Sequence, residues 1–276
     1  MRLPAALLAA VAVAVAFATA AGAAEQVAIP HGDTTLPGVL FRPEGEGPFP
    51  AVVALHGCGG LLNSSGKIFG RLADWGERLA AAGVAVLFPD SFTSRGLSSQ
   101  CRVRERRVRS SRERVADANA ARRWLQSQSW AIKNRVSLIG WSNGAITSLW
   151  AVRPRAGARD GMPDFRSAVA FYPNCRRLGD IGWSARIPTL ILIGRADDWT
   201  PAAACEQMVA GARGRSAGAI LITYPGAYHE FDRPNYPVRA LTGLAFTADG
   251  SGNAHVGTDP AARADAIKRV PEWIAR

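Results

Sequence analysis

From residue 25 onward, short runs of mostly apolar residues alternate along the chain with longer polar or amphipathic stretches. Apolar runs without polar alternation are typical of strands buried on both faces of a parallel sheet. The longer stretches favour helices near 69–82, which Gly83 ends, and near 145–152 and 261–275. This order favours one α/β domain over residues 25–276, with a doubly wound, mostly parallel sheet and a site at the carboxyl ends of its strands. The apolar runs predict strands near residues 26–29, 39–41, 51–55, 84–88, 136–139, 168–171, 189–193 and 219–223.

The N-terminal apolar run differs from these strands in length and composition. Arg2 precedes residues 3–24, which are dominated by Ala and Val and end in small residues. One positive charge, a short hydrophobic core and a small-residue end are typical of a secretory signal peptide over residues 1–24, cleaved after Ala23 or Ala24. An uncleaved membrane anchor is the alternative. Since no second apolar run is this long, we expect a secreted or periplasmic mature protein without stable membrane insertion.

Four cysteines follow the predicted signal peptide: Cys58, Cys101, Cys175 and Cys205. An even number of cysteines in an oxidising compartment favours two disulfides, for which three pairings are possible. Cys175 and Cys205 both fall near the carboxyl edge of the predicted sheet, so we expect the pairs Cys175–Cys205 and Cys58–Cys101. The second pair would tie the loop at Cys58 to the segment after Asp90. Four buried thiols are the alternative.

The formal net charge is +11, and nearly all the positive residues are arginines. The densest run spans residues 102–114, with Val108, Val115 and Ala118 among the apolar residues of an inner face. This pattern predicts the solvated flank of a helix that runs into Leu125. No aromatic residues interleave the run, so nucleic acid is not an expected partner. Weak attraction to anionic envelope polymers or to an acidic substrate is the alternative.

The apolar run at 136–139 leads directly into Gly140-Trp141-Ser142-Asn143-Gly144. A strand that ends in Gly-x-Ser-x-Gly and turns at once into a helix is typical of a nucleophile elbow, which projects the serine hydroxyl clear of the sheet. A second match, at 214–218, follows a helix-like stretch and precedes a strand, which is the reverse order. Ser142 is therefore the candidate nucleophile, and an ordinary turn is the alternative.

A serine hydroxyl needs a base to take its proton and an acid to orient that base. Two histidines follow Ser142: His229, just past a strand, and His255, in a polar loop. We predict His229 as the base and His255 as a solvated loop residue. The next-to-last predicted strand runs into Asp197-Asp198, and neighbouring residues at a strand end point to opposite sides. We favour Asp197 as the acid, with Asp198 as the alternative.

Two backbone N–H groups are needed to bind the oxyanion that forms when the serine attacks. The elbow supplies the N–H of Asn143 at the start of a helix. The loop His56-Gly57-Cys58-Gly59-Gly60 follows an early strand and supplies the second donor, the N–H of Cys58. Because His56 precedes the serine and ends a strand, we expect it to fix the loop by a hydrogen bond.

Motifs for other chemistry are missing from the sequence. No Gly-x-Gly-x-x-Gly follows a strand, no P-loop is present, and no His/Cys cluster has zinc spacing. We therefore expect the protein to need no cofactor and no metal.

Several of these blocks together resemble the dienelactone hydrolase family of α/β-hydrolases, over roughly residues 37–275. The resemblance implies an α/β-hydrolase fold, a triad of Ser142, Asp197 and His229, and a small, open pocket for esters or lactones. Family members use a cysteine nucleophile where this chain has serine, so dienelactone itself is not the expected substrate. The matching blocks are His56-Gly57-Cys58-Gly59-Gly60, Asp90-Ser91-Phe92 with Arg95-Gly96, Gly140-Trp141-Ser142-Asn143-Gly144, Tyr172-Pro173-Asn174-Cys175, Gly194-Arg195-Ala196-Asp197-Asp198-Trp199-Thr200-Pro201 and Tyr228-His229-Glu230-Phe231-Asp232.

These observations predict an exported serine hydrolase that cleaves small carboxylic esters or lactones through an acyl-enzyme. Two alternatives stay open. One is a hydrolase-fold protein that only binds ligands or envelope polymers, and the other is a peptidase or acyltransferase that uses the same triad. The sequence does not indicate the oligomeric state.

Overall fold

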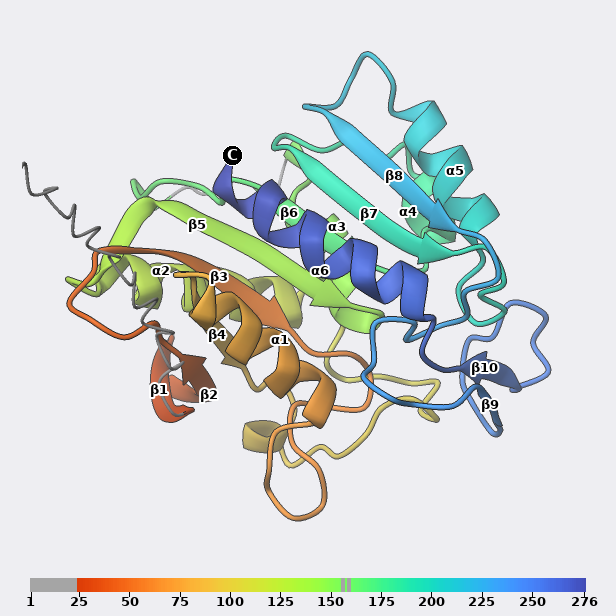
Figure 1. Ribbon diagram of the computed structural model, residues 1–276, viewed down its shortest axis with the longest axis horizontal. Helices are drawn as coiled ribbons and strands as arrows, with labels where there is room; N and C mark the ends of the chain where they lie inside the picture. Colours follow the sequence, from red (N-terminus) through yellow and green to blue (C-terminus); the bar gives the residue numbers. More distant parts are fainter. Residues whose placement is uncertain (1–23, 155–156, 158–159) are drawn as a thin grey trace, which may run out of the picture.

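The computed structural model describes residues 24–154, 157 and 160–276. The predicted signal peptide, residues 1–24, lies outside this range except for Ala24. The described chain forms one main β-sheet with helices on both faces, so the predicted α/β class is confirmed (Figure 1). Over these residues, none of the helices combines the length and apolarity that crossing a bilayer requires.

The main sheet has eight strands in the order β1-β2-β4-β3-β5-β6-β7-β8. β1 pairs antiparallel with β2, and β2 with β4, whereas all pairs from β4 onward in this order are parallel. Parallel strands present their carboxyl ends at one edge of the sheet, which gathers the loops that follow them. The strands are β1 (Glu25–His31), β2 (Thr34–Phe41), β3 (Phe49–Leu55), β4 (Ala85–Pro89), β5 (Ala131–Trp141), β6 (Ala168–Phe171), β7 (Thr189–Gly194) and β8 (Ala219–Tyr224).

Helices cover both faces of this sheet. Figure 1 shows α1 and α6 in front of the sheet and α2 and α3 behind it. An ion pair joins α1 to α6, since Asp74 Oδ2 lies 2.9 Å from Arg263 Nη2. The helices are α1 (Gly70–Ala81), α2 (Glu113–Ser127), α3 (Asn143–Ala151), α4 (Arg176–Asp180), α5 (Ala202–Gly211) and α6 (Pro260–Ala275), with a 3₁₀ turn at Thr93–Arg95.

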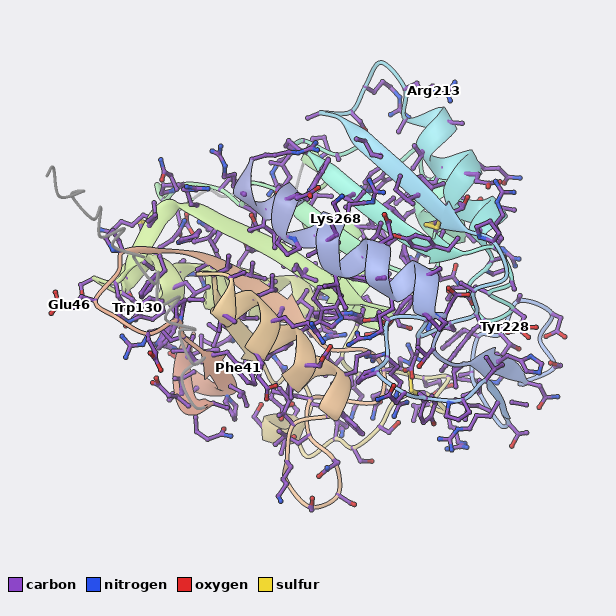
Figure 2. The ribbon with its side chains drawn as sticks, viewed as in Figure 1. Phe41, Glu46, Trp130, Arg213, Tyr228 and Lys268 are labelled. Carbon is purple, nitrogen blue, oxygen red and sulfur yellow. A yellow bond between two sulfur atoms is a disulfide. The ribbon has the colours of Figure 1, made fainter. Side chains whose placement is uncertain are left out.

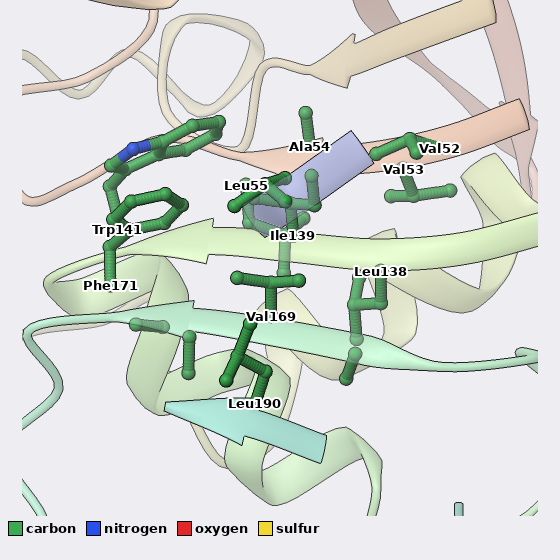
Figure 3. Packing of buried hydrophobic residues seen from close by; sticks show 14 of the residues in the cluster. Val52, Val53, Ala54, Leu55, Leu138, Ile139, Trp141, Val169, Phe171 and Leu190 are labelled. Atoms are coloured by element: carbon green, nitrogen blue, oxygen red, sulfur yellow. The ribbon is translucent and has the colours of Figure 1, made fainter. Parts of the chain in front are cut away.

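Large aromatic side chains pack the carboxyl end of the sheet. The ring of Trp141, the last residue of β5, stacks on Phe171 of β6 with centroids 5.4 Å apart and planes inclined by 12° (Figure 3). Phe88 of β4 stacks on the same indole at 6.1 Å. All three rings are fully buried. Each such pair adds about 0.5–1.5 kcal/mol to stability beyond the contribution of its buried area. The packed rings therefore stabilise the edge of the sheet from which the site loops extend.

β5 meets α3 at a junction where no side chain fits. A Cβ on Gly140 would lie 2.3 Å from the carbonyl oxygen of Gly144, and a Cβ on Gly144 would lie 2.0 Å from the carbonyl oxygen of Leu55. Both obstructing atoms belong to the backbone, which cannot swing aside as a side chain does. The two glycines therefore let α3 pack directly on β3 and β5, as the elbow pattern predicts.

The arginine-rich run forms less helix than the sequence predicts. α2 begins only at Glu113, and residues 102–112 form turns and irregular backbone. The disulfide between Cys58 and Cys101 holds the start of this segment against the loop after β3. At its other end, Glu113 Oε2 accepts the N–H of Arg109 at 2.9 Å. These contacts outweigh the helical preference of the segment.

Two arginines of α2 are buried where the sequence predicts a solvated face. Arg114 and Arg122 each have 0% exposed surface. Arg122 Nη2 binds Asp160 Oδ2 at 2.6 Å, on the segment that precedes β6. Arg114 instead binds groups beside Ser142. The flank prediction is wrong for these two residues because their acceptors come from distant parts of the chain.

A second, two-stranded sheet was not predicted. β9 (Arg239–Leu241) and β10 (Ala254–Val256) pair antiparallel, with His255 opposite Ala240. Each strand has only three residues, which is too short for a recognisable period in the sequence. The segment between them carries Phe246 to the cavity described below.

The junction between β5 and α3 gives the first testable prediction. Gly144→Ala should lower the free energy of unfolding by about 3 kcal/mol or more, because the new methyl group overlaps the Leu55 carbonyl. Gly70→Ala is the matched control in a helix, since a Cβ there meets no atom within 4 Å. Urea denaturation measures both. Equal stability of the two variants would contradict the close packing of α3 on β3.

Candidate active site

Ser142 stands between β5 and α3 with φ 51° and ψ −111°. A positive φ is costly for a residue with a side chain, and such strain concentrates at functional sites. Two backbone hydrogen bonds hold the turn: Ser142 N–H donates to the Phe171 carbonyl, and the Ser142 carbonyl accepts from Ile146 N–H, each at 2.9 Å. Tyr172 (φ 41°) and Glu230 (φ 60°) are strained in the same way, and both lie next to the predicted base.

The structure brings the predicted nucleophile, base and acid together. His229 Nε2 lies 3.0 Å from Ser142 Oγ, and His229 Nδ1 lies 2.8 Å from Asp197 Oδ2. His229 has 0% and Asp197 3% exposed surface, so water does not compete for the bond between them. The three residues follow β5, β7 and β8, whose carboxyl ends share one edge of the sheet. In this arrangement the imidazole can accept the serine proton at Nε2 while the carboxylate orients the opposite nitrogen.

Backbone and hydroxyl donors fix the Asp197 carboxylate. Its Oδ1 accepts the N–H groups of Trp199 and Thr200 at 3.0 Å and 2.8 Å. Its Oδ2 accepts the Thr200 hydroxyl at 2.9 Å, in addition to the His229 ring. The Thr200 hydroxyl also lies 3.1 Å from His229 Nδ1. Thr200 therefore helps to hold both members of the acid–base pair.

Two aromatic rings and one backbone bond confine the His229 imidazole. The ring centroids of Tyr172 and Trp199 lie 4.5 Å and 4.7 Å from it. The Gly257 N–H donates to the His229 carbonyl at 3.0 Å, just after β10. The small sheet that the sequence did not predict thus supports the loop that carries the histidine.

Asp198 and His255 form a separate pair. His255 Nδ1 lies 2.7 Å from Asp198 Oδ2, and the His255 N–H donates to Asp198 Oδ1 at 2.8 Å. The two side chains are 46% and 42% exposed. This exposure agrees with the prediction of a solvated histidine, but the predicted loop position is wrong, because His255 belongs to β10 and its ring is bound to Asp198. The structure separates the two aspartates, with Asp197 on His229 and Asp198 on His255.

The loop after β3 passes directly beside the nucleophile. A Cβ on Gly57 would lie 3.7 Å from the Cβ of Ser142, and Cys58 and Asn143 line the same cavity as Ser142. The Cys58 carbonyl accepts the Gln100 N–H at 2.7 Å, which ties this loop to the segment before Cys101. The backbone of Cys58 is therefore held from two directions, by this bond and by its disulfide.

His56 fixes the same loop through both ring nitrogens. Nε2 lies 3.2 Å from the Ser91 nitrogen, which can only donate, so Nε2 is the acceptor and Nδ1 carries the proton. Nδ1 then donates to the Gly57 carbonyl at 2.8 Å. Burial and the nearby Arg114 charge lower the pKa of His56 to about 3, which keeps the ring neutral.

The buried carboxylate of Asp232 links the aromatic cluster at the end of the sheet to the candidate site. Its Oδ2 accepts the indole N–H groups of Trp75 and Trp141, each at 2.8 Å. Its Oδ1 accepts the Tyr172 hydroxyl at 2.6 Å, and Arg71 donates to that hydroxyl at 3.0 Å. Burial raises the pKa of Tyr172 well above its usual value, so the phenol stays a neutral donor. Tyr172 and Asp232 belong to motifs that are 60 residues apart in the sequence, so no local pattern predicts that they meet.

A cavity of about 510 Å³ opens beside Ser142. Its apolar wall includes Ile146, Trp150, Trp199 and Phe246. This volume suits a small organic molecule. Over the described residues, no group of three or more His, Cys, Asp or Glu side chains is arranged to hold a metal ion. The cavity is also lined by five arginines, Arg104, Arg106, Arg109, Arg176 and Arg177, with Asp180 as the acidic residue among the lining.

Both expected cysteine pairs lie at bonding distance. The S–S distance is 2.02 Å for Cys58–Cys101 and 1.99 Å for Cys175–Cys205, and the bonds are yellow in Figure 2. The first pair connects the loop after β3 to the arginine-rich segment. The second connects the start of α4 to α5, the helix that follows the loop with Asp197.

A family model identifies the kind of hydrolase to which this fold belongs. The model of the dienelactone hydrolase family matches residues 36–276, so the chain belongs to that family. The family resemblance of the motifs is thereby confirmed.

Individual relatives are distant in sequence. The chain is 26% identical over 237 residues to a Methylorubrum extorquens protein named "Putative carboxymethylenebutenolidase", covering 77% of this chain and 75% of that one. A solved dienelactone hydrolase from Anabaena variabilis aligns with a TM-score of 0.61 at 19% identity, over 92% of this chain and 97% of that one. An acylaminoacyl peptidase of Pyrococcus horikoshii aligns with a TM-score of 0.63 at 15% identity, over 93% and 41%. The two structural matches establish the fold alone.

The neutral state of His56 gives a pH-dependent prediction. Its pKa falls from 6.5 to about 3 on folding, so its contribution to stability is full above pH 6.5 and is lost as the pH falls toward 3. Each pH unit within this window removes up to about 1.4 kcal/mol. The stability difference between the wild type and His56→Gln, measured by urea denaturation, should therefore shrink on acidification. A difference that stays constant from pH 7 to about pH 4 would contradict the buried neutral ring.

Proposed function

We propose that this protein is an exported serine hydrolase that cleaves small carboxylic esters or lactones through an acyl-enzyme. The observation that carries this proposal is the buried contact of His229 with Ser142 at 3.0 Å and with Asp197 at 2.8 Å, beside a cavity. A protein that only binds ligands has no need for this arrangement. The predicted signal peptide and the two disulfides support export to an oxidising compartment.

In the first half-reaction, Ser142 Oγ attacks the acyl carbon while its proton passes to His229 Nε2. The carbonyl oxygen becomes an oxyanion, which the N–H groups of Cys58 and Asn143 bind. Asp197 stabilises the imidazolium that has formed. The tetrahedral intermediate then expels the alcohol oxygen, which takes the proton from Nε2, and the acyl group stays on Ser142. In a lactone the expelled hydroxyl remains attached to the acyl group.

Water completes the cycle through the same groups. His229 Nε2 takes a proton from a water molecule, whose oxygen attacks the acyl carbon of the ester on Ser142. The second oxyanion forms in the same place and collapses, and Ser142 Oγ leaves with the proton held by Nε2. The products are a carboxylic acid and the regenerated serine hydroxyl.

The arginines at the cavity favour a substrate with negative charge. Arg104, Arg106, Arg176 and Arg177 line the cavity, and none of them forms an ion pair with a carboxylate of the described residues, whereas Arg109 is bound to Glu113 at 3.0 Å. Unpaired guanidinium groups bind carboxylates and phosphates well. The name carboxymethylenebutenolidase, carried by the curated relative, denotes action on a carboxylate-bearing lactone and agrees with this charge. We therefore propose anionic esters or lactones as the substrate class.

The nucleophile is tested by Ser142→Ala. This variant should lower turnover of a short p-nitrophenyl ester by about 10⁴-fold or more, because the covalent route is lost. His229→Ala should give a comparable loss, since the serine then has no base. A Ser142→Ala variant that retains near-wild-type turnover would show that the ester is cleaved elsewhere.

The charge of the substrate is tested at Arg176 and Arg177. Replacing both with Gln should raise the KM of p-nitrophenyl hemisuccinate about 5–10-fold at low salt and leave kcat and the KM of p-nitrophenyl butyrate unchanged. The control is the double variant Arg213→Gln, Lys268→Gln, which removes the same charge outside the cavity lining (Figure 2). Equal changes for both esters, or in both double variants, would refute selection of anionic substrates.

A further inference from the structure

A buried arginine that the proposed reaction does not use lies behind the oxyanion loops. Arg114 belongs to the first turn of α2 and has 0% exposed surface. Its Nη1 donates to Asn143 Oδ1 at 2.6 Å, and its Nη2 donates to the His56 carbonyl at 2.8 Å. The guanidinium lies over the ring of Phe92, 5.3 Å from the centroid. All its contacts are therefore made inside the protein.

This position is unfavourable for a cation. Arginine is almost never fully buried unless it is paired with an acid, and no carboxylate of the described residues forms an ion pair with Arg114. The two oxygens that it binds belong to neutral groups. The first turn of a helix also repels positive charge, because the backbone N–H groups point there. Burial lowers the pKa of Arg114 to about 10, and the nearby charges of Asp117 and Asp90 oppose this shift, so the side chain stays protonated near neutral pH.

The two groups that accept hydrogen bonds from Arg114 belong to two different segments beside Ser142. The His56 carbonyl begins the peptide that leads through Gly57 to Cys58, and Asn143 is the first residue of α3. These are the two segments that carry the proposed oxyanion donors. Asn143 Nδ2 also donates to Ser110 Oγ at 2.8 Å, which fixes the direction of its amide. One planar guanidinium thus links both segments.

We propose that Arg114 is a positioning residue that sets the distance and direction between the Cys58 and Asn143 N–H groups, and that its charge favours the oxyanion they bind. This inference rests on the proposed function. The rigid fork of the guanidinium holds two acceptors at once, which a lysine ammonium on a flexible stem does not reproduce. A displacement of about 1 Å at such a site costs on the order of 10²-fold in rate.

The same helix offers a matched control. Arg122, two turns further along α2, also has 0% exposed surface and lies over an aromatic ring, that of Phe165, at 5.7 Å. It binds Gln126 Oε1 at 2.9 Å and Asp160 Oδ2 at 2.6 Å, and it touches neither oxyanion segment. Arg122 is therefore a buried arginine with a purely structural role.

The experiment compares Arg114→Met with Arg122→Met, using a short p-nitrophenyl ester and phenylboronic acid, which forms a tetrahedral adduct with an active serine. Arg114→Met should lower kcat on the order of 10²-fold with KM within about 2-fold, and should weaken boronate binding by a similar factor. Arg122→Met should keep kcat per folded molecule, even where its Tm falls. Arg114→Lys should recover little of the loss.

A kcat for Arg114→Met equal to that of Arg122→Met per folded molecule would overturn the proposal. Asn143→Ala keeps the backbone N–H but cuts the link to Arg114, so it provides a second test if Arg114→Met does not fold. It should lower kcat about 10-fold, and an unchanged kcat would overturn the proposal too. Failure of the proposed function shows separately, as wild-type ester cleavage that does not depend on Ser142.

Discussion

The site depends on how closely α3 approaches β3 and β5. The backbone carbonyl of Leu55 occupies the space that a side chain on Gly144 would need, so the helix rests directly on the strand. Because of this contact, the chain turns sharply at Ser142, whose backbone has the strained, positive φ of 51°. The hydroxyl is thereby presented 3.0 Å from the His229 ring instead of facing the sheet. Every later step of the proposed chemistry uses this placement.

The strained turn is held by a polar and aromatic layer beneath it. Asp232 collects the N–H groups of two tryptophans and the hydroxyl of Tyr172, and the Tyr172 ring in turn packs against the His229 imidazole. A buried carboxylate is costly unless its hydrogen-bond donors are in place. The three donors to Asp232 therefore favour one arrangement of the residues beneath Ser142 and His229. Arg114 and the Cys58–Cys101 disulfide hold the two segments that carry the proposed oxyanion donors.

Functional residues that follow an apolar run within a few positions were predictable from the sequence. The parallel strands were recognisable because each contains an apolar run, even β5, whose first half carries Lys133, Asn134 and Arg135. Ser142, Asp197 and His229 follow three of these strands, so their meeting at one edge was predictable. Arg114 was not predictable, because a polar residue in an arginine-rich run looks exposed until its distant acceptors are known. β9 and β10 escaped notice for a related reason. Three-residue strands are stabilised by the loops they pair with, and no local period marks them.

The most direct test of this account is a crystal structure of the protein after treatment with a p-nitrophenyl alkylphosphonate. The account predicts a covalent bond from phosphorus to Ser142 Oγ and a phosphonyl oxygen about 2.7–3.1 Å from the backbone nitrogens of both Cys58 and Asn143. An adduct on another residue, or a phosphonyl oxygen that points away from these two nitrogens, would contradict it.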